Sequence, residues 1–197
     1  MGYLRHHASL ALLGTLGPDD LGDLEIRVWT DADWNGNPNT SRSTSGLYIE
    51  LYSPSSGHSF PIVWRTALQT STASSSAESE TVSLSTGLRQ EALPIQELLE
   101  TFIGSNLWLM CKVDNTQALA AAKKGYSKRL RNLGRTQRVS LGILNELIED
   151  SDLKVRMDYA STLEQKADIF TKAMQPAAFA TARALISMSE CDGIFTK

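Results

Sequence analysis

Four acidic side chains spread along the sequence could together bind metal ions. Asp31 ends a run of strand-forming residues, Glu80 lies near the start of a helical apolar stripe, and Asp114 follows a short apolar run. Asp168 lies in a later segment with helical spacing. Carboxylates are ligands that Mg²⁺ and Mn²⁺ prefer, and two such ions about 4 Å apart suit in-line phosphoryl chemistry. The acids therefore predict a two-metal site, in which the cations also relieve the repulsion between crowded carboxylates.

Two glutamates compete for the helical position in this site. Residues two apart on a helix point about 200° apart, so only one of Glu78 and Glu80 can face the sheet. Glu80 is in register with the apolar stripe that continues through Leu84 and Leu88, and we select it. Asp33, two residues after Asp31, is better explained as a turn or cap residue than as a ligand.

The expected elements place these acids at the ends of strands. Period-2 alternation and turn signals predict three consecutive antiparallel strands at residues 24–31, 44–52 and 60–66. A helix follows from residue 77 to about 102, kinked at Pro94. Further strands are expected at 107–113 and 153–157, and further helices at 116–123, 139–148 and 163–174. This order predicts an α/β fold, a mixed five-stranded sheet of three antiparallel and then two parallel strands with helices on both faces.

A basic run lies between two of the expected helices. It contains no acidic residue, and its cations are Lys123, Lys124, Lys128, Arg129, Arg131, Arg135 and Arg138. A solvated surface would account for some of these charges, but a run of one sign favours contact with nucleic-acid phosphates. The net charge of −3 means that any such attraction is local.

Length and composition indicate one main domain. We expect it at residues 24–175, with a lead-in at 1–23 that is helical over 3–13, and a tail at 176–197 that is helical over 177–188. The two cysteines, Cys111 and Cys191, are too few for a disulfide framework, which favours a reducing, cytoplasmic location. No apolar run reaches the roughly 18 residues of a membrane span, and the start of the chain does not have the pattern of an export signal.

Six short motifs follow one another in an order that resembles a known family. They are Thr30-Asp31-Ala32-Asp33-Trp34, Arg42-Ser43-Thr44-Ser45-Gly46, Ile62-Val63-Trp64, Ser76-Ala77-Glu78-Ser79-Glu80, Val113-Asp114-Asn115 and Gln165-Lys166-Ala167-Asp168-Ile169-Phe170-Thr171-Lys172. The ordered set resembles the ribonuclease H domain of copia-type LTR retrotransposon polyproteins. The resemblance covers about residues 27–174, most of the chain.

The resemblance implies a ribonuclease H-like sheet and a hydrolase that cleaves the RNA strand of RNA–DNA hybrids during reverse transcription. Asp31, Glu80, Asp114 and Asp168 would hold two Mg²⁺ ions, for which Mn²⁺ could substitute. The partners would be the hybrid and the reverse transcriptase of the same polyprotein, with a cytoplasmic location that includes virus-like particles. A non-catalytic hybrid-binding module of a polyprotein is the alternative. A 3′–5′ exonuclease ranks last, because such enzymes use Asp-x-Glu on the first strand.

Other residues receive structural explanations. Trp34, Trp64 and Trp108 are expected in the core, and Cys111 is expected to be a buried apolar residue. No histidine lies between residues 155 and 167, where cellular ribonucleases H carry one. Glu164, four residues before Asp168 on the expected helix, could take over part of that role.

Overall fold

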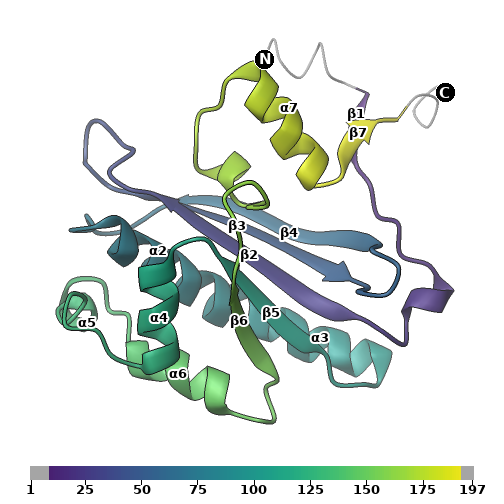
Figure 1. The fold of residues 1–197 in the computed structure, drawn as a ribbon, viewed down its shortest axis with the longest axis horizontal. Helices are drawn as coiled ribbons and strands as arrows, with labels where there is room; N and C mark the ends of the chain where they lie inside the picture. Colours follow the sequence, from purple (N-terminus) through teal and green to yellow (C-terminus); the bar gives the residue numbers. More distant parts are fainter. Residues whose placement is uncertain (1–8, 192–197) are drawn as a thin grey trace.

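A mixed five-stranded sheet forms the centre of the computed structural model, which describes residues 9–191 (Figure 1). Its strands are β2 (Glu25–Asp33), β3 (Thr44–Tyr52), β4 (Ser59–Leu68), β5 (Trp108–Val113) and β6 (Val155–Tyr159), in the order β4-β3-β2-β5-β6. The β2–β3 and β3–β4 pairs are antiparallel, and the β2–β5 and β5–β6 pairs are parallel. The predicted α/β fold is confirmed: a mixed five-stranded sheet in which three strands are antiparallel and the next two are parallel.

One face of the sheet is covered by most of the helices. They are α2 (Ser76–Thr86), the π-helix η2 (Gly87–Ala92), α3 (Leu93–Ile103), α4 (Thr116–Lys124), α5 (Leu133–Thr136) and α6 (Leu141–Glu149). Alternate strand residues such as Ile26 and Val28 point to this face and pack against Leu84 and Leu88. Because side chains alternate across a strand, the period-2 pattern of the sequence creates this core directly.

The long helix predicted over 77–102 is three consecutive segments. Ser75 caps the first of them, its side chain accepting a hydrogen bond from the Glu78 amide. Pro94 lies in the first turn of α3, after the π-helix, where a missing amide is tolerated. Gly87, at the start of η2, lies so close to the sheet that a Cβ there would come within 2.9 Å of Leu47 and 3.0 Å of Thr30.

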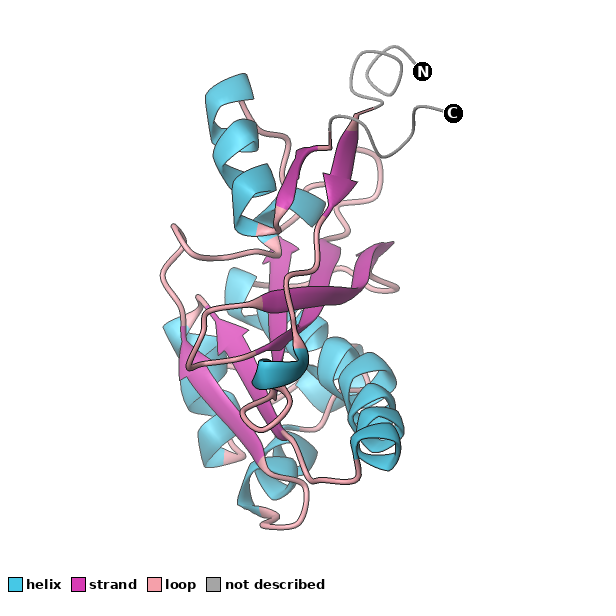
Figure 2. Cartoon of the chain, turned by 90° about the vertical axis from the view of Figure 1, so that its right-hand side faces the viewer, coloured by secondary structure: helices cyan, strands magenta, loops and turns pink. Residues whose placement is uncertain are grey.

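The second face carries a smaller apolar cluster and the C-terminal elements. Trp29 and Tyr48 pack there with Ala160, Ala167 and Ile186. The elements above them are the short 3₁₀ helix η3 (Asp168–Phe170), α7 (Pro176–Leu185) and a two-stranded sheet of β1 (Leu10–Leu12) and β7 (Met188–Glu190) (Figures 1 and 2). The Tyr48 hydroxyl donates to the Ile186 carbonyl at 3.2 Å, which fixes this layer on the sheet.

Three expected helices differ from the structure. Part of the helix predicted over 3–13 is strand β1, which pairs with β7, while residues 3–8 lie outside the described part of the chain. The helix predicted over 163–174 is wrong, because only the three residues of η3 are helical there. The helix predicted over 177–188 is α7, which ends at Leu185 before Met188 enters β7.

The tryptophans predicted in the core are also placed differently. Trp34 and Trp64 are each 51% exposed, and Trp108 is 38% exposed. The Trp34 indole donates to the Ala73 carbonyl at 3.0 Å, and the Arg156 guanidinium lies 4.0 Å from the Trp108 ring centroid. Trp34 and Trp108 therefore make polar or cationic contacts at the surface, as amphipathic aromatic side chains do.

Among residues 9–191, no helix is both long enough and apolar enough to cross a membrane. Cys111 is buried, as expected, and Cys111 and Cys191 are both free thiols.

Candidate metal centre and nucleic-acid interface

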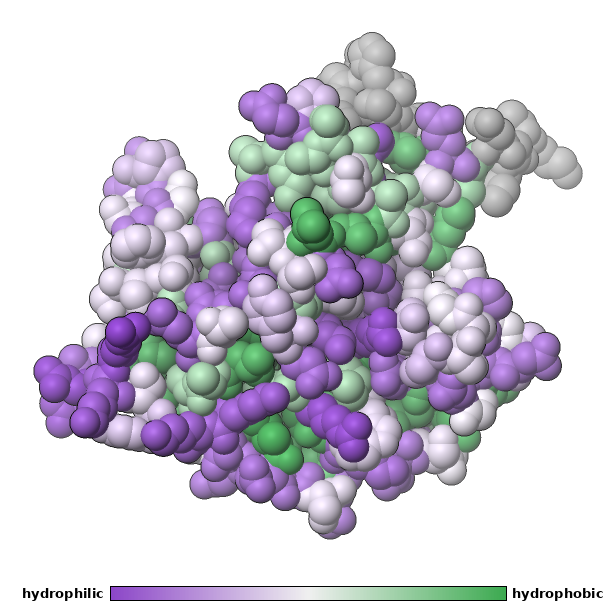
Figure 3. Space-filling view, in the orientation of Figure 1, coloured by the Kyte–Doolittle hydropathy of each residue, from purple (hydrophilic) through white to green (hydrophobic). Residues whose placement is uncertain are grey.

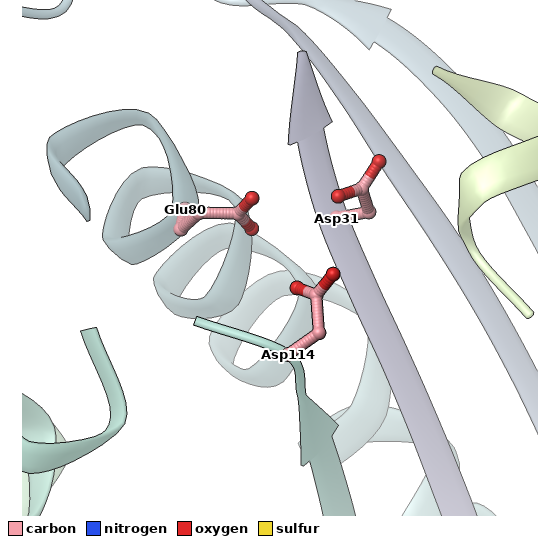
Figure 4. Close-up of side chains that lie close together, drawn as sticks. All are labelled: Asp31, Glu80 and Asp114. Carbon is pink, nitrogen blue, oxygen red and sulfur yellow. The ribbon is translucent and has the colours of Figure 1, made fainter. Parts of the chain in front are cut away.

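Three of the four predicted acids meet at the C-terminal ends of the parallel strands β2 and β5. Asp31, Glu80 and Asp114 each offer a carboxylate oxygen, and these oxygens lie within 4.8 Å of one another (Figure 4). The parallel pairing of Trp29 with Lys112 brings Asp31 and Asp114, each two residues further along, to the same edge. Glu80 reaches this edge from α2. The cluster is therefore a direct product of two parallel strands ending beside one helix.

Two buried oxygens of this cluster lack the partners that buried charges need. Asp31 and Glu80 are buried, and Asp114 is half-buried. Among the described residues, Glu80 Oε2 and Asp114 Oδ1 have no hydrogen-bond partner. Burial, together with the charges of Asp31 and Asp114, raises the pKa of Glu80 to about 9. Burial and the Asp31 charge likewise raise the pKa of Asp114. Buried, repelling and unpartnered oxygens fit a cation, so these three residues could hold a metal ion.

The fourth predicted acid, Asp168, is connected to this cluster by Lys172, which contacts both Asp168 and Asp31. The Lys172 ammonium lies 2.7 Å from Asp168 Oδ1 and 3.4 Å from Asp31 Oδ1. Thr171, which precedes Lys172 in the sequence, donates its hydroxyl hydrogen bond to Asp31 Oδ2. Burial raises the pKa of Asp168 to about 6 in spite of the hydrogen bond from Lys172. Asp168 is therefore next to the three-carboxylate cluster without being part of it.

The segment that carries Asp168 is attached to the second face of the sheet by buried polar side chains. Gln165 donates through Nε2 to the Thr30 carbonyl at 3.1 Å. Lys166 contacts both carboxylate oxygens of Glu50 at 2.7 and 2.8 Å, and the Trp29 indole donates to the same carboxylate at 3.0 Å. These tertiary contacts explain why the segment does not form the predicted helix.

The Glu50 contacts could not be found from the sequence pattern. Glu50 shares one side of β3 with Tyr48 and Tyr52 and alternates with the apolar Ile49 and Leu51, and such a polar residue indicates the solvent-facing side of a strand. In the structure Glu50 is 0% exposed, because the C-terminal segment covers that side. The one signal was Lys166, a cation inside an otherwise buried motif with Gln165 and Ala167.

The competing glutamate points to a different part of the molecule. The Glu78 carboxylate accepts hydrogen bonds from the Ser74 amide at 3.0 Å, from the Thr136 hydroxyl at 3.0 Å and from Gln137 Nε2 at 3.1 Å. It accepts a further one from the Ser74 hydroxyl. Glu80 and Glu78 therefore serve opposite sides of the first turns of α2. Glu164, proposed above to replace a histidine, binds Ser161 in a turn rather than standing on a helix with Asp168.

The basic run lies beside the start of α2, and all its cationic side chains are at least partly exposed. Lys124, Lys128 and Arg129 line a cavity of about 610 Å³ together with Ser74 and Ser75, and no acidic residue lines it. Arg138 lines a second groove of about 430 Å³ with Arg65 and Arg89, again without an acid. Lys123, Arg131 and Arg135 line neither. Figure 3 shows hydrophilic side chains gathered at the edge of the molecule that α5 occupies.

Comparisons with known proteins add a structural similarity. No protein-family model matches the sequence. The structure is similar to that of the prototype foamy virus protease-reverse transcriptase, with a TM-score of 0.39 and 9% sequence identity. The alignment covers 83% of this chain and 20% of that protein, so the chain spans about a fifth of its length.

Proposed function

We propose that this protein is a metal-dependent endonuclease that cleaves the RNA strand of RNA–DNA hybrids, as the ribonuclease H domain of a copia-type retrotransposon polyprotein would during reverse transcription. The observation that carries the proposal is the cluster of Asp31, Glu80 and Asp114, with unpartnered oxygens, at the strand ends of a ribonuclease H-like sheet. An exposed basic run close to the same helix supports a nucleic-acid substrate.

The proposed site holds two Mg²⁺ ions, or Mn²⁺ in their place. Asp31, Glu80 and Asp114 supply an all-oxygen donor set, the kind that these hard cations prefer. Asp168 joins them from η3, where its carboxylate now contacts Lys172. When bound, the ions activate a water for attack on the phosphodiester and stabilise the leaving oxygen.

The proposed substrate contacts divide between two parts of the molecule. The basic run binds backbone phosphates, since neutralising them releases counterions. The carboxylate cluster receives the RNA strand, which the 2′-hydroxyl and the hybrid geometry distinguish from DNA. The partner would be the reverse transcriptase of the same polyprotein. The free cysteines fit a reducing, cytoplasmic location.

A cleavage assay on matched duplexes tests the activity. We expect Mg²⁺-dependent cutting of the RNA strand in an RNA–DNA hybrid, and none in DNA–DNA or RNA–RNA duplexes of the same sequence. Chelation should abolish the cutting. Binding of the hybrid without cleavage in either Mg²⁺ or Mn²⁺ would favour the alternative, a non-catalytic hybrid-binding module.

Salt dependence tests the basic run. Replacing Lys128, Arg129 and Arg131 together by alanine should weaken hybrid binding and reduce the slope of log K against log[salt] by about one for each phosphate that is no longer neutralised. The control is Arg156→Ala, which removes a basic residue on β6, outside the run. An unchanged slope in the triple variant would mean that these residues do not contact the backbone.

A further inference from the structure

Glu78 connects two segments that are distant in sequence. Its carboxylate binds Ser74, just before α2, and also Thr136 and Gln137 at the end of α5. Gln137 Nε2 also donates to the Thr72 carbonyl at 2.9 Å. The end of the basic run is thereby attached to the start of the helix that carries Glu80.

The carboxylate is well suited to this contact. Glu78 is 6% exposed, and its carboxylate oxygens only accept hydrogen bonds, as those of an ionised carboxylate must. Hydrogen bonds to a charged acceptor are about twice as strong as neutral ones, so each donor is held firmly.

The contact lies between the two basic surfaces described above. Ser74, Lys128 and Arg129 line the cavity on one side, and Gln137 and Arg138 line the groove on the other. Arg138 adopts the left-handed backbone conformation, with a φ of 55°. The other side-chain contacts of the run include the Arg129 bond to Gln117 and the Asn145 bond to the Lys123 carbonyl.

We propose that Glu78 is a positioning residue for nucleic-acid binding, which fixes the basic run against α2. The run and the carboxylate cluster then contact one duplex at a fixed spacing. This inference rests on the proposed function. A fixed segment loses less conformational freedom on binding than a loose one, so the contact contributes to affinity without touching the duplex.

Limited proteolysis measures whether Glu78 holds the run. Trypsin cuts after lysine and arginine, and the exposed run offers Lys128, Arg129, Arg131 and Arg135. In Glu78→Gln we expect cutting at these sites to be about tenfold faster, because local opening controls the rate and a hydrogen bond to a charge is worth about that factor. Mass spectrometry of the fragments separates cutting in the run from global unfolding.

Glu91→Gln is the matched control. Glu91 is a partly buried glutamate of the next helical segment, η2, and it accepts a bond from Arg65 rather than from the run. Its replacement should leave cutting within the run unchanged.

Steady-state kinetics then measure the effect of the substitution on hybrid binding. Glu78→Gln should raise KM for the hybrid about tenfold and leave kcat within about twofold, whereas a metal ligand would lose kcat. A double variant, Thr136→Val with Gln137→Leu, should raise KM similarly, and adding Glu78→Gln to it should cause little further change. Additive losses, or wild-type KM in Glu78→Gln, would overturn the inference.

The two levels of the proposal fail in different ways. If the alanine variant of Lys128, Arg129 and Arg131 binds the hybrid as tightly as wild type, the run does not bind nucleic acid and both the interface and this inference are wrong. If that variant is defective but Glu78→Gln changes neither proteolysis nor KM, the interface stands and only the role of Glu78 is wrong.

Discussion

Two groups of buried charges lie at neighbouring positions of the same sheet, and they differ in whether their charges have partners. Trp29 and Asp31, two residues apart on β2, point to the same side. At Trp29 the charge of Glu50 is matched by Lys166 and by the indole hydrogen bond. At Asp31 three carboxylates meet, and two of their buried oxygens have no partner in the described structure.

We interpret the paired group as a structural contact and the unpaired group as a candidate functional site. Unpartnered buried charges destabilise a fold, and a fold retains them where a ligand completes them. Lys166 is largely buried and serves one carboxylate, whereas Lys172 is 39% exposed and stands at 3.4 Å from Asp31. The paired charges should therefore matter for stability, and the unpaired charges for activity.

The largest expected effect is on catalysis, in Asp114→Asn. The substitution removes a ligand charge with little change of volume, so we expect cleavage to fall roughly a thousandfold, about 4 kcal/mol in the barrier, while the fold is kept. Cleavage assays on the hybrid measure the loss of activity, and thermal unfolding measures whether the fold is kept. Asp158→Asn, a partly exposed aspartate on β6, is the control. Wild-type turnover by Asp114→Asn would remove that residue from the site.

The reverse outcome is expected for Lys166→Met. It leaves Glu50 buried without its cation, which should lower the free energy of unfolding by about 3–5 kcal/mol, as measured in urea. Lys112→Met is the control, because its ion pair with Asp158 is long and partly exposed and should be worth under about 1 kcal/mol. Adding Glu50→Gln to Lys166→Met should restore part of the loss. Equal stability of Lys166→Met and wild type would contradict the distinction between paired and unpaired charges.

Glu80→Gln should stabilise the metal-free protein. A carboxyl whose pKa is raised by folding binds its proton more tightly when folded, so its contribution is favourable below the unfolded value near 4.5 and is lost as the pH rises toward 9. At pH 7 with a chelator, the glutamine variant should gain about 3 kcal/mol, and the gain should vanish below about pH 4.5. A pH-independent difference would show that the charge of Glu80 is not the cause.

The smallest effect is expected at Asp20, a buried carboxylate of the N-terminal loop. Hydrogen bonds from Ser56, the Gly17 amide and His58 lower its pKa. A lowered pKa gives stability above the unfolded value near 3.8 that disappears as the pH falls through the folded one. Asp20→Asn should therefore flatten the acid limb of the unfolding profile and leave hybrid cleavage unaltered. A changed cleavage rate would connect this loop to the site.

The sequence predicted the sheet well because its strands are short runs of strand-forming or apolar residues bounded by turn residues. Apolar runs, the alternation of residues 44–52 and turn residues locate the strands, the helical connections indicate which of them are parallel, and the parallel pairing brings Asp31 and Asp114 together. Helical geometry alone separates Glu80 from Glu78, and the structure places only Glu80 beside them. These features depend on local periodicity, which a single sequence contains.

The errors arose where distant segments decide the outcome. Residues 163–174 have helical spacing, but the side chains of Gln165 and Lys166 bind the sheet and the backbone follows them. The sequence pattern of Glu50 is that of a surface residue, but the C-terminal segment covers it in the structure. Trp64 resembles a core residue although it lies on the edge strand β4. Such contacts join residues far apart in the chain, and local patterns do not contain them.

The pairing of β1 with β7 has a mechanical consequence. Leu10 is opposite Glu190, and the Cys191 amide donates to the Ser9 carbonyl at 2.9 Å, so the chain enters and leaves the described domain at one point. A force that pulls these two points apart acts across the strands and breaks their hydrogen bonds one pair at a time. The short ribbon would thus peel open under low tension, before any load reached β2 and the carboxylates at its end.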